Sequence, residues 1–402
     1  MLQAEQHAGR ENAPEAAALP LAVTRLTLTD FRNYAAERIE AAPRPVVLTG
    51  PNGAGKTNVL EALSYLTPGR GLRGVRLPEL ARIGGAGGWS VAARIETPTG
   101  VAAVGTGIEG RTADGDDDGA ADDGSVERRV VRIDGAPARG PAALADLIRV
   151  VWLTPQMDRL FIEGRSDRRR FLDRLVLGYD PEHGRRVGAY ERVMRERLKL
   201  LRDGGGDDVW LSALEGRMAE ATVAIAAARR EAVMRLRGAL AAGIGPFPRA
   251  ELTVRGLAED LLGEFAAVDV EGRLQALLRR NRHADRDANR TQEGAHRADL
   301  EVTHLAKGLP AGLCSTGEQK ALLVAVVLAD ARLQAVHRGA PPLLLLDEVA
   351  AHLDEARREA LFDEILALGC QAWMTGTDRA LFERLTGKAL FLGVAQGKVN
   401  NG

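Results

Sequence analysis

A glycine-rich loop near the start of the chain has the residue types and spacing that bind nucleoside triphosphates. Residues 50–57 read Gly-Pro-Asn-Gly-Ala-Gly-Lys-Thr and match the pattern G-x-x-x-x-G-K-[ST] at every specified position. In such a loop the glycines let backbone N–H groups surround phosphate oxygens, the lysine neutralises the β- and γ-phosphates, and the threonine hydroxyl is a ligand for Mg²⁺. The predicted ATP-binding residues are Gly50, Pro51, Asn52, Gly53, Ala54, Gly55, Lys56, Thr57 and Asn58.

An acidic motif near the other end of the chain supplies the groups that hydrolysis still requires. Residues 343–346 are four leucines followed by Asp347 and Glu348, which predicts a buried strand with carboxylates at its C-terminal end. Asp347 would hold Mg²⁺ together with Thr57, and Glu348 would orient and deprotonate the attacking water. Glu348 and Lys56, which would neutralise the phosphates, are predicted catalytic residues.

The elements around both motifs agree with this chemistry. Residues 45–49 predict a short buried strand before the loop, and residues 58–66 predict the helix whose positive dipole end faces the phosphates. A glycine-rich turn without a ligand, and an apolar strand followed by a solvated acidic turn, are the plainer interpretations. The agreement of strand, loop, helix and acidic strand disfavours them.

The wide separation of the two motifs indicates the class of fold. A second glycine motif, at residues 315–320, precedes the acidic strand. A large insertion therefore divides one ATPase fold, which is the layout of ATP-binding-cassette (ABC) ATPases. We expect an α/β P-loop ATPase of this type with an inserted helical lobe.

Helical periodicity predicts the form of the insertion. Apolar residues recur at helical spacing from Val187 to Leu201 and again from Leu211 to Ile225, and Gly204–Gly206 separates the two runs. We expect a short antiparallel helical hairpin, since a helix of ~20 residues spans only ~30 Å.

Composition fits a nucleotide-driven protein without a membrane segment. Of 402 residues, 45% are hydrophobic and 27% are charged, which is enough to build two lobes. The longest apolar run, residues 321–329, is much shorter than the ~20 residues that a bilayer requires and predicts a buried helix. Cys314 and Cys370 are too few for a disulfide framework or a zinc cluster. Residues 1–22 lack the order of a signal peptide, so we expect a disordered tail and a cytoplasmic, nucleoid-associated location.

Charge is unevenly distributed although the formal net charge is only −1. Residues 111–124 are acidic and predict a solvated loop on a hairpin, whereas residues 165–202 and 279–297 are rich in arginine. Ion pairing on a solvated helix face is one interpretation of the arginines, and contact with the phosphates of duplex DNA is favoured. Aromatic residues are only 4% of the chain and are not interleaved with the arginines, which disfavours base stacking on single strands. The DNA-binding candidates are Arg168, Arg169, Arg170, Arg195, Arg279 and Arg282.

The motifs together resemble those of the RecF family of bacterial recombination mediators, which is related to the ATPase heads of structural-maintenance-of-chromosomes (SMC) and Rad-type proteins. The resemblance runs from about Val23 to the C-terminus. The matching segments are the first strand and its Phe-Arg-Asn-Tyr turn at 26–34, the Q-loop region at 154–173, later motifs at 294–299 and 314–320, and the D-loop at 351–354.

The resemblance implies an ATP-dependent head-to-tail homodimer, in which the signature motif of one subunit closes over the nucleotide of the other. Gln156 would be a third catalytic residue and would couple the Mg²⁺ site to the helical lobe. The dimer would clamp duplex DNA beside a single-strand gap. With RecO and RecR it would promote loading of RecA, in support of DNA replication and the SOS response. Slow, DNA-dependent hydrolysis would reset the clamp. The residues acting in trans would be Ser315, Thr316, Gly317, Glu318 and Asp354.

The expected domain organisation follows the order of these motifs. It comprises a tail at 1–22, a first part of the ATPase lobe at 23–155, a helical arm lobe at 156–300, and a second part of the ATPase lobe at 301–402.

Other functions remain as alternatives. A transporter ATPase would carry a switch histidine, where this chain has Thr375 and Thr377 as candidate replacements; His296 and Arg297 are either switch-like or structural. Another DNA-processing ATPase of the SMC or ABC type would have a longer coiled coil or a nuclease domain. A nucleotide-gated DNA scaffold with negligible ATPase activity is the strongest non-enzymatic alternative, and the intact Lys56, Asp347 and Glu348 argue against it.

Overall fold

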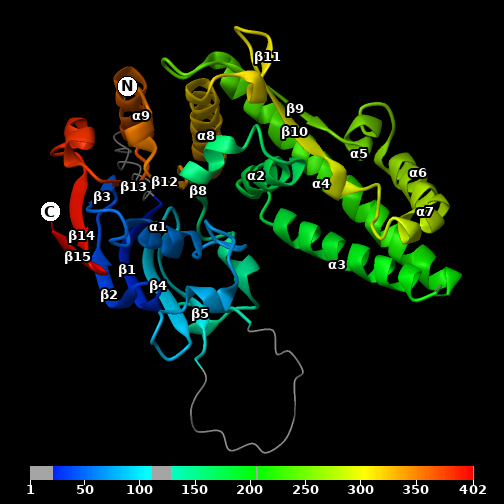
Figure 1. Cartoon of the computed structure of the whole chain (residues 1–402), viewed down its shortest axis with the longest axis horizontal. Helices are drawn as coiled ribbons and strands as arrows, with labels where there is room; N and C mark the ends of the chain where they lie inside the picture. The colour runs from blue at the N-terminus through cyan, green and yellow to red at the C-terminus, as the bar shows by residue number, and fades with distance from the viewer. Residues whose placement is uncertain (1–20, 111–127, 205–206, 402) are drawn as a thin grey trace, which may run out of the picture.

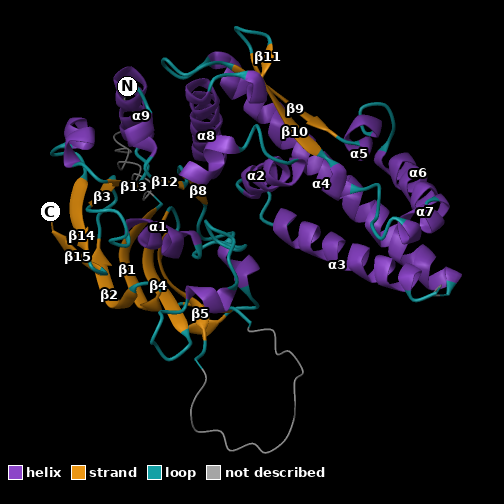
Figure 2. Ribbon diagram, in the orientation of Figure 1, coloured by secondary structure: helices purple, strands orange, loops and turns teal. Residues whose placement is uncertain are grey.

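The computed structural model describes residues 21–110, 128–204 and 207–401. They form an ATPase lobe built around two sheets and a helical arm that projects from it (Figure 1 and Figure 2). The predicted acidic loop at 111–124 and the predicted tail, except for Leu21 and Ala22, lie outside the described residues.

A six-stranded sheet positions the nucleotide motifs. In spatial order its strands are β15 (Lys398–Asn401), β14 (Leu390–Ala395), β3 (Val46–Thr49), β13 (Ala372–Gly376), β12 (Leu343–Leu346) and β8 (Val150–Leu153). All are parallel to their neighbours except β15. The strands are nearly continuous apolar runs because helix α1 (Lys56–Ser64) packs on one face and α8 (Thr316–Arg338) on the other. The predicted strands before the phosphate loop and the acidic motif are therefore confirmed, as is the buried helix over residues 321–329.

A second sheet curves over α1. Its strands, in spatial order, are β2 (Tyr34–Glu40), β1 (Ala22–Phe31), β4 (Trp89–Thr97), β5 (Gly100–Ile108), β6 (Val130–Ile133) and β7 (Ala136–Pro137), and all neighbours are antiparallel. Buried and exposed residues alternate along β4, so one face packs on α1 and the other faces solvent. Strands β5 and β6, which flank the acidic segment, pair as predicted for a hairpin.

The arm is built on two antiparallel helices, but the second is much longer than predicted. Helix α3 covers His183–Arg202, and α4 covers Asp208–Ala242. The C-terminal half of α4 places Ala232, Leu236 and Leu240 in the same core as α8, so α4 roots the arm in the ATPase lobe. The remaining elements are α2 (Arg165–Leu177), α5 (Leu257–Leu261), α6 (Ala267–Arg280), α7 (Arg282–Asp287), β9 (Ala250–Arg255), β10 (Asp299–His304), β11 (Leu309–Pro310) and, in the ATPase lobe, α9 (Glu355–Leu368).

Three further features test expectations from the sequence: the boundary of the arm, the cysteines and the membrane. The expected boundary at residue 300 falls inside β10, which pairs with β9 along the arm. Cys314 and Cys370 are buried free thiols. Among the helices that the structure describes, none combines the length and the apolar character needed to cross a membrane.

Candidate functional site

The phosphate loop leaves β3 at Thr49 and closes on itself before α1 begins. Gly53 and Gly55 have φ angles of 79° and 115°, a backbone conformation that favours glycine. Lys56 Nζ donates hydrogen bonds to the carbonyl oxygens of Gly50 (2.8 Å) and Pro51 (3.0 Å), so the ammonium group lies across the cradle that the loop forms. The loop therefore directs backbone N–H groups, a helix N-terminus and one cation toward a single point.

The turn between β1 and β2 braces this loop from outside. Asn33 Nδ2 donates to Ala54 O (3.0 Å), and the Tyr34 hydroxyl donates to Gly55 O (3.0 Å). A Cβ on Gly55 would meet Asn33 Nδ2 at 2.5 Å, so this glycine is also required for close packing. Sequence reasoning did not assign Asn33 and Tyr34 to the site. The only available signal was their place in the Phe-Arg-Asn-Tyr turn.

The acidic motif meets the phosphate loop at the C-terminal end of the sheet. Thr57 Oγ1 donates a hydrogen bond to Asp347 Oδ1 at 2.8 Å, although 290 positions separate the two residues in sequence. Thr375, at the end of β13, donates to the same carboxylate oxygen at 2.8 Å. The predicted pair of Thr57 and Asp347 is thus brought into direct contact.

Glu348 is held in an unusual backbone conformation. Its φ of 53° and ψ of 18° are left-handed, which costs a residue other than glycine about 1 kcal/mol or more. Its backbone N–H donates to Thr375 Oγ1 at 2.9 Å. Of the two candidate switch residues, Thr375 contacts both carboxylate residues, whereas Thr377 is exposed beside Gly50 at the rim of the loop.

The donor set fits ATP and Mg²⁺. An alcohol oxygen and a carboxylate oxygen already in contact are the hard oxygen ligands that Mg²⁺ prefers, and Thr57 and Asp347 would hold the ion beside the phosphates. Burial lowers the pKa of Lys56, while the carboxylates of Glu348 and Asp347 act in the opposite direction. The two carboxylates thus favour the charged form of the lysine, which is the form that binds phosphate oxygens.

Gln156 lies three residues beyond the end of β8, at the neighbouring edge of the same sheet. It is exposed on the short 3-10 helix Pro155–Arg159. Asp158 on that helix accepts a hydrogen bond from Lys320 Nζ at 3.0 Å, and Lys320 belongs to the first turns of α8. The Q-loop segment and the signature helix are therefore linked by a partly buried ion pair.

The signature residues occupy an exposed helix N-terminus. Ser315 caps α8, and its hydroxyl and backbone N–H both donate to Glu318 Oε2, at 3.0 and 3.1 Å. Ser315, Thr316 and Gly317 are exposed, so their end of the helix is open to a ligand or a second protein. Asp354 is likewise exposed and caps α9 by accepting from Arg357 N at 2.9 Å.

Two of the predicted DNA-binding arginines form hydrogen bonds within the protein at the base of the arm. Arg168 makes two hydrogen bonds to the carboxylate of Asp299, at 2.8 and 2.9 Å. Arg169 donates to Ala298 O at 2.9 Å, and Arg170 is exposed and forms an ion pair with Asp167. The triplet therefore fastens α2 to β10 and leaves mainly Arg170 facing solvent.

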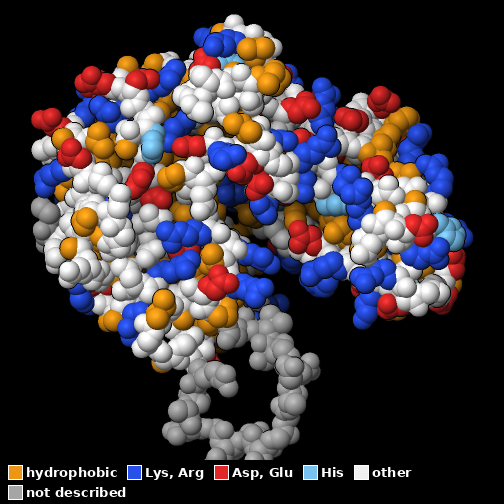
Figure 3. All heavy atoms as spheres, in the orientation of Figure 1, with side chains coloured by type: hydrophobic (Ala, Val, Ile, Leu, Met, Phe, Trp, Pro, Cys, Tyr) orange, Lys and Arg blue, Asp and Glu red, His pale blue; other side chains and the backbone are white. Residues whose placement is uncertain are grey.

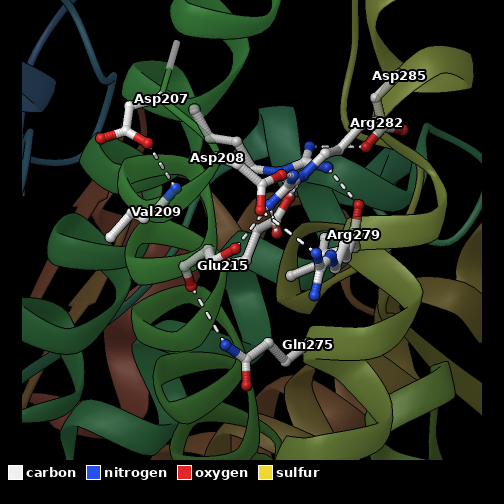
Figure 4. Close-up of polar contacts among 11 residues, drawn as sticks. Asp207, Asp208, Val209, Glu215, Gln275, Arg279, Arg282 and Asp285 are labelled. Carbon is white, nitrogen blue, oxygen red and sulfur yellow. Dashed lines mark hydrogen bonds and ion pairs between the residues drawn. The ribbon is translucent and has the colours of Figure 1, made fainter. Parts of the chain in front are cut away.

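The arginines at the arm tip are also paired (Figure 4). Arg282 bonds to both oxygens of the buried Glu215, at 2.9 and 2.7 Å, and also pairs with Asp208. Arg197, which is fully buried, donates to Glu215 at 3.0 Å. Arg279 pairs with Asp208 at 3.3 Å but remains exposed, as does Arg195 on α3. Of the six candidates, Arg170, Arg195 and Arg279 are exposed, whereas the other three are only partly accessible to solvent.

His296 has a structural environment in the arm. Its Nδ1 hydrogen bonds with the Tyr190 hydroxyl at 2.6 Å, its Nε2 with Thr291 O at 2.8 Å, and its ring stacks on Tyr190. The geometry thus favours the structural interpretation of this histidine.

The fold and the site define an ABC-type P-loop ATPase with an SMC-like head. The family model of the "RecF/RecN/SMC N terminal domain" matches residues 22–398. The chain is 53% identical to the DNA replication and repair protein RecF of Mesorhizobium japonicum, over 94% of this chain and 97% of that one. It is 49% identical to RecF of Agrobacterium fabrum, over 94% and 98%. The chain belongs to the RecF family of DNA replication and repair proteins.

Solved structures show the same fold. A structure of "the recombination mediator protein RecF-ATPrS in RecFOR pathway" superposes with a TM-score of 0.80 at 20% identity and covers 95% of this chain and 98% of that one. An Smc head domain from Pyrococcus furiosus, solved with the C-terminal domain of ScpA, covers 94% of this chain and 95% of that one, at 14% identity and a TM-score of 0.52.

Proposed function

We propose that the protein is an ATP-driven mediator of DNA recombination and repair, and that ATP closes two copies into a head-to-tail dimer around DNA. The observation that carries this proposal is the separation of the two glycine motifs. The phosphate loop follows β3, and strands β13 and β12 separate β3 from β8. The 3-10 helix after β8 contacts the start of α8 through the hydrogen bond from Lys320 to Asp158. Three strand spacings amount to ~14 Å, so the exposed signature residues are displaced from the nucleotide cradle of their own subunit.

In the proposed dimer each subunit completes the site of the other. Lys56 and the loop N–H groups bind the β- and γ-phosphates, and the N-terminus of α8 from the second copy covers the γ-phosphate with Ser315 and Gly317. Glu348 orients and deprotonates the attacking water, while Mg²⁺, when bound, supplies charge neutralisation at the phosphates. Asp354, exposed at the start of α9, is a proposed contact across the interface.

Coupling to the arm is proposed to run through the Q-loop. Gln156 senses the nucleotide site, and the Asp158–Lys320 ion pair transmits its position to the signature helix. Slow, DNA-dependent hydrolysis then opens the dimer.

We propose that the dimer binds duplex DNA at a position next to a single-strand gap. Lys and Arg side chains gather around the hollow between the ATPase lobe and the arm on the face shown in Figure 3. A cationic hollow suits a phosphate backbone. The RecF structures named for the RecFOR pathway support RecO and RecR as partners. Membership of the RecF family is the ground for proposing RecA loading as the outcome and the cytoplasm, at the nucleoid, as the location.

Complementation between two inactive variants tests the head-to-tail arrangement. Ser315→Arg blocks the signature motif, and Lys56→Met disables the phosphate loop. A mixed dimer contains one site with an intact loop from the first variant and an intact signature from the second. We expect ATP hydrolysis that neither variant shows alone; a mixture as inactive as its components would contradict the shared site.

A further inference from the structure

The solvent face of the antiparallel sheet carries a row of arginines that the proposed function has not used. The registers place Arg38, Arg25, Arg94 and Arg132 on one face, on β2, β1, β4 and β6 respectively. These strands span four spacings, or ~19 Å. Arg25, Arg94 and Arg132 line a groove of about 620 Å³.

The acids on this face neutralise only part of the charge. Glu40 accepts from both Arg25 (2.9 Å) and Arg38 (2.8 Å). Asp134 accepts from a backbone N–H of β5 at 2.7 Å. Glu96, two positions after Arg94 on β4, faces the same side, and the Asp134 carboxylate makes no ion pair within the described parts of the chain, so four arginines stand against three acids and the excess of positive charge is small. Of the four, Arg94 and Arg132 are exposed and have no direct ion-pair partner among the described residues.

One pair of these arginines is placed unfavourably for the isolated protein. Arg25 on β1 lies directly opposite Arg94 on β4. Like charges at directly opposite positions of antiparallel strands destabilise a sheet. The Glu40 carboxylate, which pairs with Arg25, offsets part of this repulsion. An anion beside Arg94 would offset the rest, so the position suits a ligand that carries negative charge.

The floor between the arginines is made of small side chains. On β4 and β5 the residues that face the groove include Ala92, Ala103 and Gly105. A Cβ on Gly105 would meet no atom within 4 Å, so no internal contact requires a glycine there. Glycine in a strand costs about 0.5–1 kcal/mol relative to alanine and often marks a place where another backbone approaches closely.

We propose that this groove binds the sugar-phosphate backbone of duplex DNA, as a contact surface separate from the hollow beside the arm. Guanidinium groups spaced along the groove can contact successive phosphates of a polyanion. The small side chains between them let its backbone approach the sheet closely. The described lining contains no aromatic side chain on which an unpaired base could stack, which favours duplex over single-stranded DNA. The inference rests on the proposed function, because it locates part of the DNA contact.

Two kinds of variant test the groove in the full-length protein with an ATP analogue. Arg94→Gln with Arg132→Gln removes two charges, and Arg94→Lys with Arg132→Lys is the matched control that keeps them. Gly105→Tyr fills the floor without changing charge, and its φ lies outside the left-handed region, so the sheet tolerates the side chain. Circular dichroism and ATP affinity report whether each variant is folded.

The measurement is the affinity for a fluorescent duplex, and separately for a single strand, across a salt series. We expect the double glutamine variant to flatten the slope of log K against log salt by about 2 and the lysine control to keep it. Gly105→Tyr should weaken duplex binding by about tenfold. Unchanged duplex binding in both the glutamine and tyrosine variants, while the wild type binds duplex, would overturn the groove alone. Loss of single-strand binding only would also overturn it. A wild type that does not bind duplex would overturn the proposed function as well.

Discussion

Thr375→Val removes one hydroxyl group from the centre of the hydrolytic site. The Thr375 side chain is 1% exposed, donates to Asp347 Oδ1 at 2.8 Å and accepts from Glu348 N at 2.9 Å. Valine has nearly the same volume, so the change leaves no cavity. It removes a hydrogen bond to a carboxylate, valued at about 1.5–3 kcal/mol, and leaves the partly buried N–H of Glu348 without its protein partner. We expect the free energy of unfolding to fall by about 2 kcal/mol.

The larger expected effect of Thr375→Val is on catalysis, because this hydroxyl fixes the strained backbone of Glu348. If about 1.4–3 kcal/mol of transition-state stabilisation is lost, kcat for ATP hydrolysis falls about 10- to 100-fold. Phosphate release at saturating ATP measures kcat, and calorimetry should show ATP affinity changed by less than about threefold. Thr375→Ser keeps the hydroxyl and should retain most activity. The reasoning fails if Thr375→Val has wild-type kcat, or if Thr377→Val, at the exposed rim, is the variant that loses it.

The remaining predictions concern the phosphate loop, the arm and a buried acid. Lys56→Met should abolish ATP binding in calorimetry, because the loop loses its cation; undiminished affinity would refute the assignment. Arg197→Met should lower the free energy of unfolding by about 3 kcal/mol in chemical denaturation, since Asp285 would remain buried without its ion-pair partner and Glu215 would keep only Arg282; a stability equal to wild type would contradict this. Burial raises the pKa of Asp330 to about 7 from 3.8. The folded state therefore holds a proton that the unfolded chain releases, so stability should fall by about 1.4 kcal/mol per pH unit between about pH 4 and 7. Asp330→Asn should flatten that dependence, and an unchanged pH profile would show that this carboxyl group does not control it.

The elements of the site that are local in sequence were predictable. The strand, loop and helix around Lys56 and the apolar strand before Asp347 follow from motif spacing and from periodicity over a few residues. The second arm helix was predicted too short, because the apolar residues that continue beyond Ile225 pack against the ATPase lobe rather than against α3. Periodicity shows that a face is apolar, but not which partner covers it.

The pairing of Thr57 with Asp347 was predictable from the two motifs, but the partners of individual arginines were not. Arg168 pairs with Asp299, 131 positions away, and Arg282 pairs with Glu215, 67 positions away. A cluster of arginines looks the same in sequence whether its charges are exposed or paired. The choice of Thr375 over Thr377 likewise depends on which residue ends a buried strand beside Asp347.

The central claim is that ATP joins two copies of this chain through the exposed signature motif. Glu348→Gln removes the base that activates water but keeps every predicted phosphate contact, so the ATP-bound state should accumulate. The direct measurement is the molar mass of this variant by light scattering, with and without saturating ATP, beside the double variant that also carries Ser315→Arg. A dimer that forms only with ATP, and only when Ser315 is intact, is the predicted result. A monomer at saturating ATP, or a dimer that forms regardless of Ser315, would contradict the account.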